Sequence, residues 1–426
     1  QNLNGYLLVN KLHIHILGIC GTFMAGLAGL AIQKGYKVTG QDKAYYPPMS
    51  TQLTSLGIKV NQTEDIIDDL DKCDAVIIGN SLSRGNKTVE YILDKGIEHY
   101  SGPEWIKNHI LKNKYVFVVS GTHGKTTTTS MLIKILQESG KNPSYLVGGI
   151  YKDNDISYKY TSSDYFIIEG DEYDTSFFDK RSKFIHYKPD VLIINNLEYD
   201  HSDIFENIDQ IKKQFHFLIR TMSKNKNIIY DHEDFHTLSL LSMGCWCKKI
   251  PYKKIKNINN IIGDHNLKNA SAAIAAAEII GIKKNDSILA LENFSGVKRR
   301  LELISNKNFI LYDDFAHHPT AISASIEAIK SKHPGKKIFV FFEIRSNSMI
   351  SGAHKNKLID SFREAEKVFI YCKNNISWFH DSIKCKIYKD LDTISSKIIA
   401  NIENVDIVIL MSNGDTSYII KKLNQL

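Results

Sequence analysis

Long apolar runs are absent from this sequence of 426 residues. No stretch approaches the roughly 18 consecutive apolar residues that a membrane-spanning helix needs, so we expect no membrane span and no membrane partner. The first 11 residues have too short an apolar core, and no small-residue cleavage site, for a secretory signal. They also lack an initiator methionine, and we interpret them as an extension or a processed end that gives no information about function.

Cysteine is also scarce. The six cysteines are scattered, and no Cys-x-x-Cys pair occurs among them. Cys245 and Cys247 flank Trp246, but this isolated pair does not predict a zinc site. We therefore expect reduced cysteines that serve mostly in packing, and a cytoplasmic protein.

Clusters of positive charge are missing as well. Lysine and arginine number 54 against 47 aspartates and glutamates, which gives a net charge of +7, and the lysines are dispersed. This pattern favours a solvated basic surface over a nucleic-acid-binding face, and a modest positive field would help to gather anionic nucleotides. A hydrophobic fraction of 43% and a charged fraction of 24% are typical of a soluble globular protein. At ~150 residues per domain, we expect about three domains.

The sequence does contain a phosphate-binding loop. A continuous apolar stretch over 115–119 predicts a buried parallel strand, and a helical pattern that stops at Gly140 follows it. In such a strand–loop–helix unit, backbone N–H groups bind phosphate oxygens, Lys125 reaches the outer phosphates and the Thr126 hydroxyl can ligate Mg²⁺. The general P-loop would place a glycine at Val119, so this loop is a shorter form. An ordinary turn with a solvated lysine is the alternative. We expect ATP contacts from Gly121, Thr122, His123, Gly124, Lys125, Thr126 and Thr127.

The loop sequence GTHGKTTT over 121–128 resembles the ATP loop of the Mur ligases, the ATP-dependent amide-forming enzymes of peptidoglycan assembly. The resemblance runs from about Ile14 to Leu423 and implies a three-domain α/β architecture. Its parts would be a Rossmann-like UDP-sugar-binding domain over 1–112, a central P-loop ATPase-like domain over 113–294 and a Rossmann-like acceptor-binding domain over 295–426. Strands that alternate with helices along the chain also indicate parallel, doubly wound sheets.

The N-terminal third begins with a strand over 13–17 and a glycine turn over 18–26. A Gly-x-Gly-x-x-Gly dinucleotide motif would need glycine at Cys20 and Phe23, so the NAD fingerprint is not met. The turn instead resembles the UDP-sugar-binding turn of the Mur ligases, and a further strand over 75–81 should end at the same edge. Tight packing of strand on helix is the alternative for each glycine. The resemblance implies UDP-sugar contacts from Gly18, Cys20, Gly21, Thr22, Asp42 and Ser81.

Acidic residues follow two central strands beside the phosphate loop. A strand over 165–169 delivers Glu169, and a strand over 191–196 leads to Asp200 and His201. Such an edge suits a hard cation that bridges ATP phosphates. The order NNLEYDHSD over 195–203 also resembles the magnesium-binding turn of the family, although solvated acidic turns are common. We therefore expect Thr126, Glu169 and His201 to be metal ligands.

The segments 46–51 and 171–184 resemble one branch of the family, which joins UDP-N-acetylmuramate to a preformed tripeptide. Two departures stand beside this resemblance. Several Mur ligases carry a carbamoylated lysine where this chain has Phe215 and His216. The stretch 247–263 is also shorter than expected, as if edge strands of the central sheet were trimmed.

Residues 263–269, GDHNLKN, open an alanine-rich helix over 270–280. The resemblance implies that His265 and Asn269 lie against the adenine. Helix capping is an equally good physical reason for an asparagine at position 266 or 269.

Farther along the chain, the resemblance implies that Arg300 reaches toward the ATP phosphates and that Asp314 contacts the nucleotide ribose. His317 and His318 lie close to two aspartates, but their spacing is poor for one tetrahedral ion. Arg345 lies just past a strand expected over 337–342, where its guanidinium could grip a carboxylate of the acceptor with two hydrogen bonds. A surface salt bridge is the alternative. At the last turn, residues 415–418 replace a glycine-rich run expected in the family.

These observations predict an ATP- and Mg²⁺-dependent ligase that joins UDP-N-acetylmuramate to L-alanyl-γ-D-glutamyl-meso-diaminopimelate through an acyl phosphate, in peptidoglycan recycling. Lys125, His201 and Arg345 are the expected catalytic residues. The alternatives are a UDP-N-acetylmuramate–L-alanine ligase, and a nucleotide-binding protein of the same family that has lost turnover.

Overall fold

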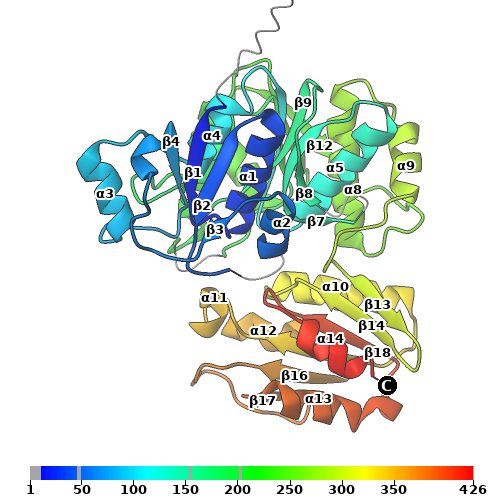
Figure 1. Cartoon of the computed structure of the whole chain (residues 1–426). Helices are drawn as coiled ribbons and strands as arrows, with labels where there is room; N and C mark the ends of the chain where they lie inside the picture. Colours follow the sequence, from blue (N-terminus) through cyan, green and yellow to red (C-terminus); the bar gives the residue numbers. More distant parts are fainter. Residues whose placement is uncertain (1–10, 46–48, 153–155, 201–203, 426) are drawn as a thin grey trace, which may run out of the picture.

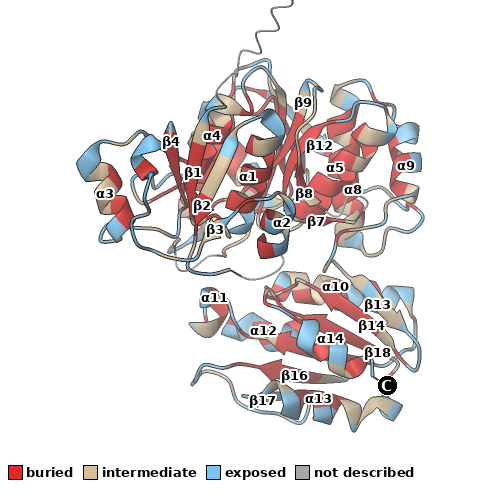
Figure 2. Ribbon diagram, in the orientation of Figure 1, coloured by how far each residue is buried: buried red, intermediate tan, exposed pale blue. Residues whose placement is uncertain are grey.

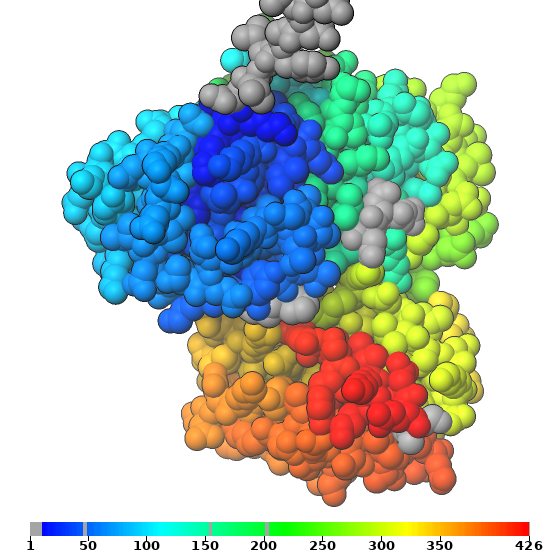
Figure 3. All heavy atoms as spheres, in the orientation of Figure 1, coloured from blue at the N-terminus to red at the C-terminus, as the bar shows by residue number. Residues whose placement is uncertain are grey.

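The computed structural model describes residues 11–45, 49–152, 156–200 and 204–425. They form three β-sheets with helices packed against them (Figure 1). The sheets of the N-terminal and central thirds lie side by side, and the C-terminal third forms a separate lobe below them in the view of Figure 3. The expected α/β class with three successive units is confirmed.

The first sheet is parallel, with the strand order β3-β2-β1-β4-β5. Its central strands are buried and continuously apolar, as parallel strands covered on both faces are. The strand expected over 75–81 ends at Ile78, because the chain turns there and Gly79 O accepts a hydrogen bond from Leu82 N. The elements are β1 (His13–Leu17), α1 (Thr22–Lys34), β2 (Lys37–Gln41), α2 (Met49–Ser55), β3 (Val60–Asn61), η1 (Leu70–Lys72), β4 (Ala75–Ile78), α3 (Lys87–Lys95), β5 (His99–Ser101) and α4 (Gly102–His109).

The central sheet has seven strands in the order β12-β11-β10-β6-β9-β7-β8. Alternate residues of β6 enter apolar clusters on opposite faces, Val118 on one and Val119 on the other. The elements are β6 (Tyr115–Ser120), α5 (Lys125–Glu138), β7 (Ser144–Tyr151), β8 (Ile156–Lys159), β9 (Tyr165–Gly170), η2 (Lys183–His186), β10 (Val191–Ile194), α6 (Ile208–Arg220), β11 (Asn227–Asp231), α7 (Phe235–Ser242), β12 (Lys248–Tyr252), α8 (Asp264–Ile279) and α9 (Lys284–Glu292).

Two features of the central sheet differ from the expectation. β7 and β8 form an antiparallel hairpin at one edge, whereas the sequence indicated parallel strands. At the other edge, the short stretch 247–263 still supplies β12, which pairs with β11 in parallel.

The third sheet has the order β13-β14-β18-β15-β16-β17 and is parallel except for β13, which runs antiparallel to β14. Buried residues line its strands and the inner faces of its helices (Figure 2). The elements are β13 (Glu302–Asn306), β14 (Ile310–Asp314), α10 (Pro319–Lys332), β15 (Ile338–Glu343), α11 (Asn347–Ile350), α12 (Lys355–Ser361), β16 (Lys367–Tyr371), β17 (Cys385–Tyr388), α13 (Leu391–Ile399), η3 (Ile402–Asn404), β18 (Ile407–Met411) and α14 (Ser417–Leu423).

Helix α1 fastens the first sheet to the hairpin of the second. A Cβ atom added at Gly26 would lie 2.4 Å from Leu146 Cδ1, and one added at Gly29 would lie 2.2 Å from the ring of Tyr158. Only glycine permits this close approach, so Gly26 is a packing residue of the helix and not part of the preceding turn. A single apolar cluster accordingly runs from Ile16 of β1 into the central unit. None of the described helices is long and apolar enough to span a bilayer.

Candidate functional site

The phosphate loop joins the carboxyl end of β6 to the first turn of α5. Gly121 and Gly124 have φ angles of +124° and +80°, which residues with a Cβ atom rarely adopt. A Cβ at Gly124 would also lie 2.4 Å from Asn269 Oδ1. The loop is braced by the chain after β10, since Thr122 N donates to Asn196 O at 3.0 Å and His123 N donates to Asn196 Oδ1 at 2.8 Å. The predicted cradle is therefore present at a helix N-terminus.

Lys125 lies almost buried at the start of α5. Its Nζ donates to Gly121 O at 2.8 Å and forms an ion pair with Glu172 at 3.0 Å. Burial lowers the pKa of Lys125, but the carboxylates of Glu172 and Asp171 raise the pKa further, so the net shift is upward and the ammonium is retained. Glu172 was not among the predicted site residues. The acidic stretch after β9 signals it, although only the fold shows that it meets the lysine.

Thr126, Glu169 and Arg300 meet beside the loop. Thr126 Oγ1 donates to Glu169 at 3.2 Å, and Gly148 N donates to the other Glu169 oxygen at 2.8 Å. Burial and nearby Asp171 raise the pKa of Glu169 to about 7. A buried carboxylate beside another acid is a site that a cation stabilises. The third predicted ligand, His201, lies outside the described residues.

Arg300 comes from the segment that leads into the third sheet. Its Nη2 donates to Thr126 Oγ1 at 3.3 Å, and its guanidinium lies 4.7 Å from the centre of the Phe315 ring. The flanking residues Arg299 and Leu301 have φ angles of +59° and +48°, and this sharp turn directs Arg300 to the loop. Asp314 is buried and accepts a hydrogen bond from Leu301 N at 3.3 Å. Burial raises the pKa of Asp314, and its contact with a ribose stays a prediction.

The N-terminus of α8 lies against the phosphate loop. Asn269 Oδ1 is 3.5 Å from Asn195 Nδ2, and Asn269 Nδ2 donates to Asn266 Oδ1 at 3.3 Å. Gly263 holds the N-cap position without a side-chain capping bond, so capping does not explain either asparagine. His265 is partly buried, and burial lowers its pKa to about 4. A neutral imidazole there can stack on an uncharged base.

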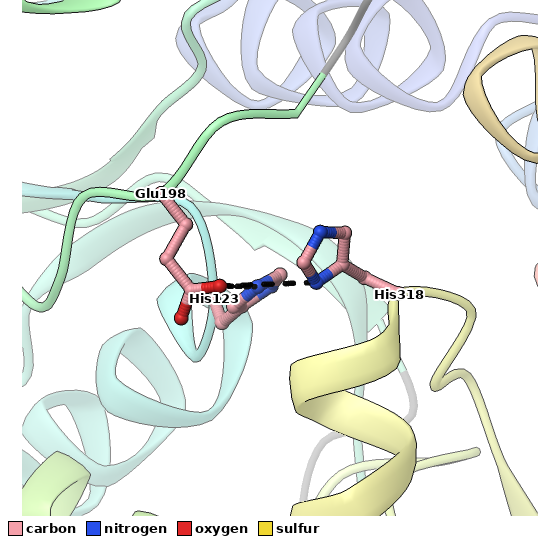
Figure 4. A group of neighbouring side chains, drawn as sticks. All are labelled: His123, Glu198 and His318. Atoms are coloured by element: carbon pink, nitrogen blue, oxygen red, sulfur yellow. Dashed lines mark ion pairs between the residues drawn. The ribbon is translucent and has the colours of Figure 1, made fainter. Parts of the chain in front are cut away.

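His123 of the phosphate loop faces the third sheet across Glu198, a residue of the loop after β10. Figure 4 shows His123 beside both Glu198 and His318. A carboxylate oxygen of Glu198 lies 3.8 Å from His123 Nε2 and 4.0 Å from His318 Nδ1. Thr320 Oγ1 also donates to Glu198 at 2.6 Å. The central and C-terminal units therefore meet through polar side chains at the loop.

The predicted UDP-sugar residues gather at the carboxyl edge of the first sheet. Gly18 follows β1 with a φ of +73°, and Cys20 N donates to Asp42 Oδ2 at 2.9 Å. Asp42 thus fixes the turn that precedes α1, which begins at Thr22 just after Gly21. Ser81 Oγ would lie 3.7 Å from a Cβ placed at Gly18.

Arg345 lies exposed after β15, at the carboxyl edge of the third sheet. A Cβ atom at Gly414, in the loop after β18, would lie 2.3 Å from its Nη1. Arg345 thus packs on the backbone of the last turn, whose Thr416 Oγ1 donates to Asp313 at 3.0 Å. The predicted residues form one group at the central sheet and one at the first sheet, with Arg345 at the edge of the third sheet.

Known proteins of related sequence and structure agree with this arrangement. Residues 13–114 match the Mur ligase family catalytic domain, 119–244 the Mur ligase middle domain and 299–414 the Mur ligase glutamate ligase domain. The UDP-N-acetylmuramate–L-alanyl-γ-D-glutamyl-meso-2,6-diaminoheptandioate ligase of Haemophilus influenzae is 40% identical over 96% of this chain and 98% of its own. The UDP-N-acetylmuramate–L-alanine ligase of Syntrophomonas wolfei is 31% identical over 77% of this chain and 76% of its own. The crystal structure of a murein peptide ligase from Psychrobacter arcticus superposes with a TM-score of 0.72 at 34% identity, covering 97% of this chain and 98% of that one.

Proposed function

The chain belongs to the Mur ligase family, and on that premise we propose that it joins UDP-N-acetylmuramate to the tripeptide L-alanyl-γ-D-glutamyl-meso-diaminopimelate. The observation that carries the choice of tripeptide is the 40% identity, over 96% of the chain, to the Haemophilus ligase of that name. The alanine-adding relative is 31% identical over 77% of the chain. This reaction forms a C–N bond at the expense of ATP and serves peptidoglycan recycling.

An amide does not form from a resting carboxylate, so the muramate carboxylate must be activated. Transfer of the γ-phosphoryl group of ATP to a carboxylate oxygen gives an acyl phosphate and ADP. The tripeptide amine then attacks the carbonyl carbon, loses a proton and expels inorganic phosphate. The acyl phosphate must be kept from water until the amine arrives.

Lys125 and Arg300 supply the positive charge for the first step. Lys125 pairs with Glu172 in this structure. When ATP binds, its outer phosphates would replace Glu172 as the partner of the Lys125 ammonium group. Arg300 already reaches Thr126 from the side of the C-terminal unit. Docking of that unit therefore brings a second cation to the phosphates and covers the site. Gly124 and Thr127 would contribute backbone N–H groups, whereas the N–H of His123 is already used by Asn196 and its contact with ATP stays a prediction.

The residues around Thr126 fit a magnesium ion. Its hydroxyl and the Glu169 carboxylate lie 3.2 Å apart, and Asp171 adds negative charge close by. Oxygen ligands of this kind suit Mg²⁺, which usually keeps some water and binds substrate phosphates as well. When bound, the ion would neutralise charge on the phosphates. We keep His201 as a third candidate ligand by family resemblance.

The remaining assignments follow the same family logic. We propose that the turn at Gly18 and Asp42 binds the UDP-sugar, that His265 and Asn269 contact adenine, and that Arg345 holds an acceptor carboxylate. We also propose domain limits of 1–112, 113–294 and 295–426, which fall between the three sheets. The six unpaired cysteines, all in the described part of the chain, support a cytoplasmic location.

An acceptor panel tests this proposal. The protein is incubated with ATP, Mg²⁺ and UDP-N-acetylmuramate, together with the tripeptide, L-alanine or no acceptor. We expect phosphate release that depends on both substrates, and a product with the mass of UDP-N-acetylmuramoyl-tripeptide. A preference for L-alanine would establish the alternative acceptor. Nucleotide binding without phosphate release in any combination would mean that turnover has been lost.

A further inference from the structure

Two histidines and an aspartate meet where the C-terminal unit docks on the central one. Asp200 lies in the loop after β10, His318 precedes α10 and His354 precedes α12. All three are buried. One ligand-type atom from each lies within 4.8 Å of the others, and Asp200 Oδ1 is 3.7 Å from His354 Nε2. The two imidazole rings are 4.5 Å apart at an angle of 78°.

The imidazole nitrogens that face this cluster lack hydrogen-bond partners. The Nε2 atoms of His318 and His354 are both buried and make no hydrogen bond with the described residues. His318 Nδ1 accepts from Thr320 N at 3.4 Å and lies 4.0 Å from Glu198 Oε2. A metal on Nε2 would therefore require the ring proton to move to Nδ1, beside the Glu198 carboxylate. Burying a polar atom without a partner is unfavourable, so two such atoms at one point call for an explanation.

We propose that Asp200, His318 and His354 bind one divalent transition-metal ion, most simply Zn²⁺, across the interface of the two units. Zinc sites that keep an open position take three protein ligands and one water, with Zn–N and Zn–O distances of ~2.0–2.2 Å. That geometry places ligand atoms about 3.3 Å apart. The 3.7 Å separation of Asp200 and His354 needs only a small side-chain rotation to reach it.

The ligand types separate this site from the magnesium site. Imidazole nitrogen suits zinc, nickel and copper, whereas Mg²⁺ prefers oxygen. The neighbouring group of His123, Glu198 and His318 is the weaker candidate. Glu198 already accepts from Thr320 at 2.6 Å, and His123 belongs to the phosphate loop. The spacing of His317 and His318 in the sequence did not predict this site. The third ligand, His354, comes from a later loop and joins His318 only in the folded chain.

An ion held in this way would link the two units. One ligand comes from the central unit and two come from the C-terminal unit, so binding must favour the docked arrangement. The bound metal ion would therefore stabilise the arrangement in which the C-terminal unit is docked on the central unit. The proposal concerns metal binding alone and does not rest on the ligase reaction.

The test uses the whole protein, freed of metal by chelation and kept free of nucleotide. Zn²⁺ is titrated by calorimetry, and Co²⁺ is added separately because a tetrahedral or five-coordinate Co²⁺ ion absorbs visible light strongly. We expect one Zn²⁺ per chain with a dissociation constant below ~10 μM, an intense Co²⁺ band and a raised melting temperature. His354→Gln should weaken binding by about 100-fold or more, since even outer partners of a metal contribute 10–100-fold.

His333→Gln is the matched control, because His333 lies in the same unit but bonds to Tyr312 at 3.0 Å, away from the cluster. It should bind Zn²⁺ as the unaltered protein does. Circular dichroism checks that His354→Gln is folded. Failure of the unaltered protein to bind Zn²⁺ would overturn the proposal, as would equal affinity in a folded His354→Gln protein. Phosphate release is not needed for either result, so a failed ligase assay leaves this test intact.

Discussion

The ion pair of Lys125 and Glu172 permits a test that separates stability from catalysis. The two side chains are 14% and 3% exposed and lie 3.0 Å apart. Lys125→Met removes the charge and keeps most of the stem. Loss of one partner from a buried pair costs ~3–5 kcal/mol, because the other charge is left uncompensated. We therefore expect Lys125→Met to lower the free energy of unfolding by about that amount.

Adding Glu172→Gln to Lys125→Met should restore much of the lost stability, since the buried carboxylate that has lost its ion pair with Lys125 is then gone. Turnover behaves differently. Both the single and the double variant lack the ammonium for the phosphates, so phosphate release should fall by ~10²-fold or more in each. Stability should recover while activity does not.

The assays are urea unfolding, followed by circular dichroism, and phosphate release with both substrates. Lys373→Met is the control, because Lys373 is exposed and its loss should change stability by less than ~0.5 kcal/mol. Near-normal phosphate release from Lys125→Met would refute the phosphate-loop assignment. Equal stability of the single variant, the double variant and the unaltered protein would refute the energetic reasoning.

Two further predictions concern the metal and the acceptor. Because the pKa of Glu169 is raised to about 7, the folded protein holds a proton that the unfolded chain releases above about 4.5. In the absence of Mg²⁺, this group should make the free energy of unfolding fall with rising pH between those values, by up to ~1.4 kcal/mol per unit. Glu169→Gln should remove the pH dependence of the free energy of unfolding, and it should raise the Mg²⁺ concentration needed for half-maximal phosphate release. If neither quantity changes, Glu169 neither holds the proton nor binds the metal. Arg345→Lys should lower kcat/KM for the tripeptide by ~10- to 150-fold, corresponding to ~1.5–3 kcal/mol, with the KM for ATP unchanged. Unaltered tripeptide use would show that Arg345 does not contact the acceptor.

Much of the fold could be predicted because its signals are local. The apolar strand before the phosphate loop and the glycines within it lie in one short stretch, and the structure has β6 and α5 there. The antiparallel hairpin of β7 and β8 was missed. Its role becomes visible only when α1 packs on it through Gly26 and Gly29.

The site was predicted in part for the same reason. Lys125 and Thr126 begin the helix that follows β6, and Glu169 lies near the end of β9, which pairs with β6 in parallel, so the topology brings them together. Glu172 and His354 could not be assigned, because their partners come from other segments and no spacing rule connects them. The arrangement of Arg300 toward Thr126 was implied by family resemblance and not by any local pattern.

The apolar cluster shared by β1 and the central sheet has a consequence for cooperativity. One cluster among the described residues spans the first and second sheets, whereas the two clusters of the C-terminal unit contain residues of that unit alone. We therefore expect the three sheets to melt as two units. Scanning calorimetry should resolve two transitions, the N-terminal and central thirds melting together as one. Three transitions, or unfolding of the N-terminal third before the central third, would contradict this expectation. Either result would show that the packing of α1 on β7 and β8 does not couple the two units.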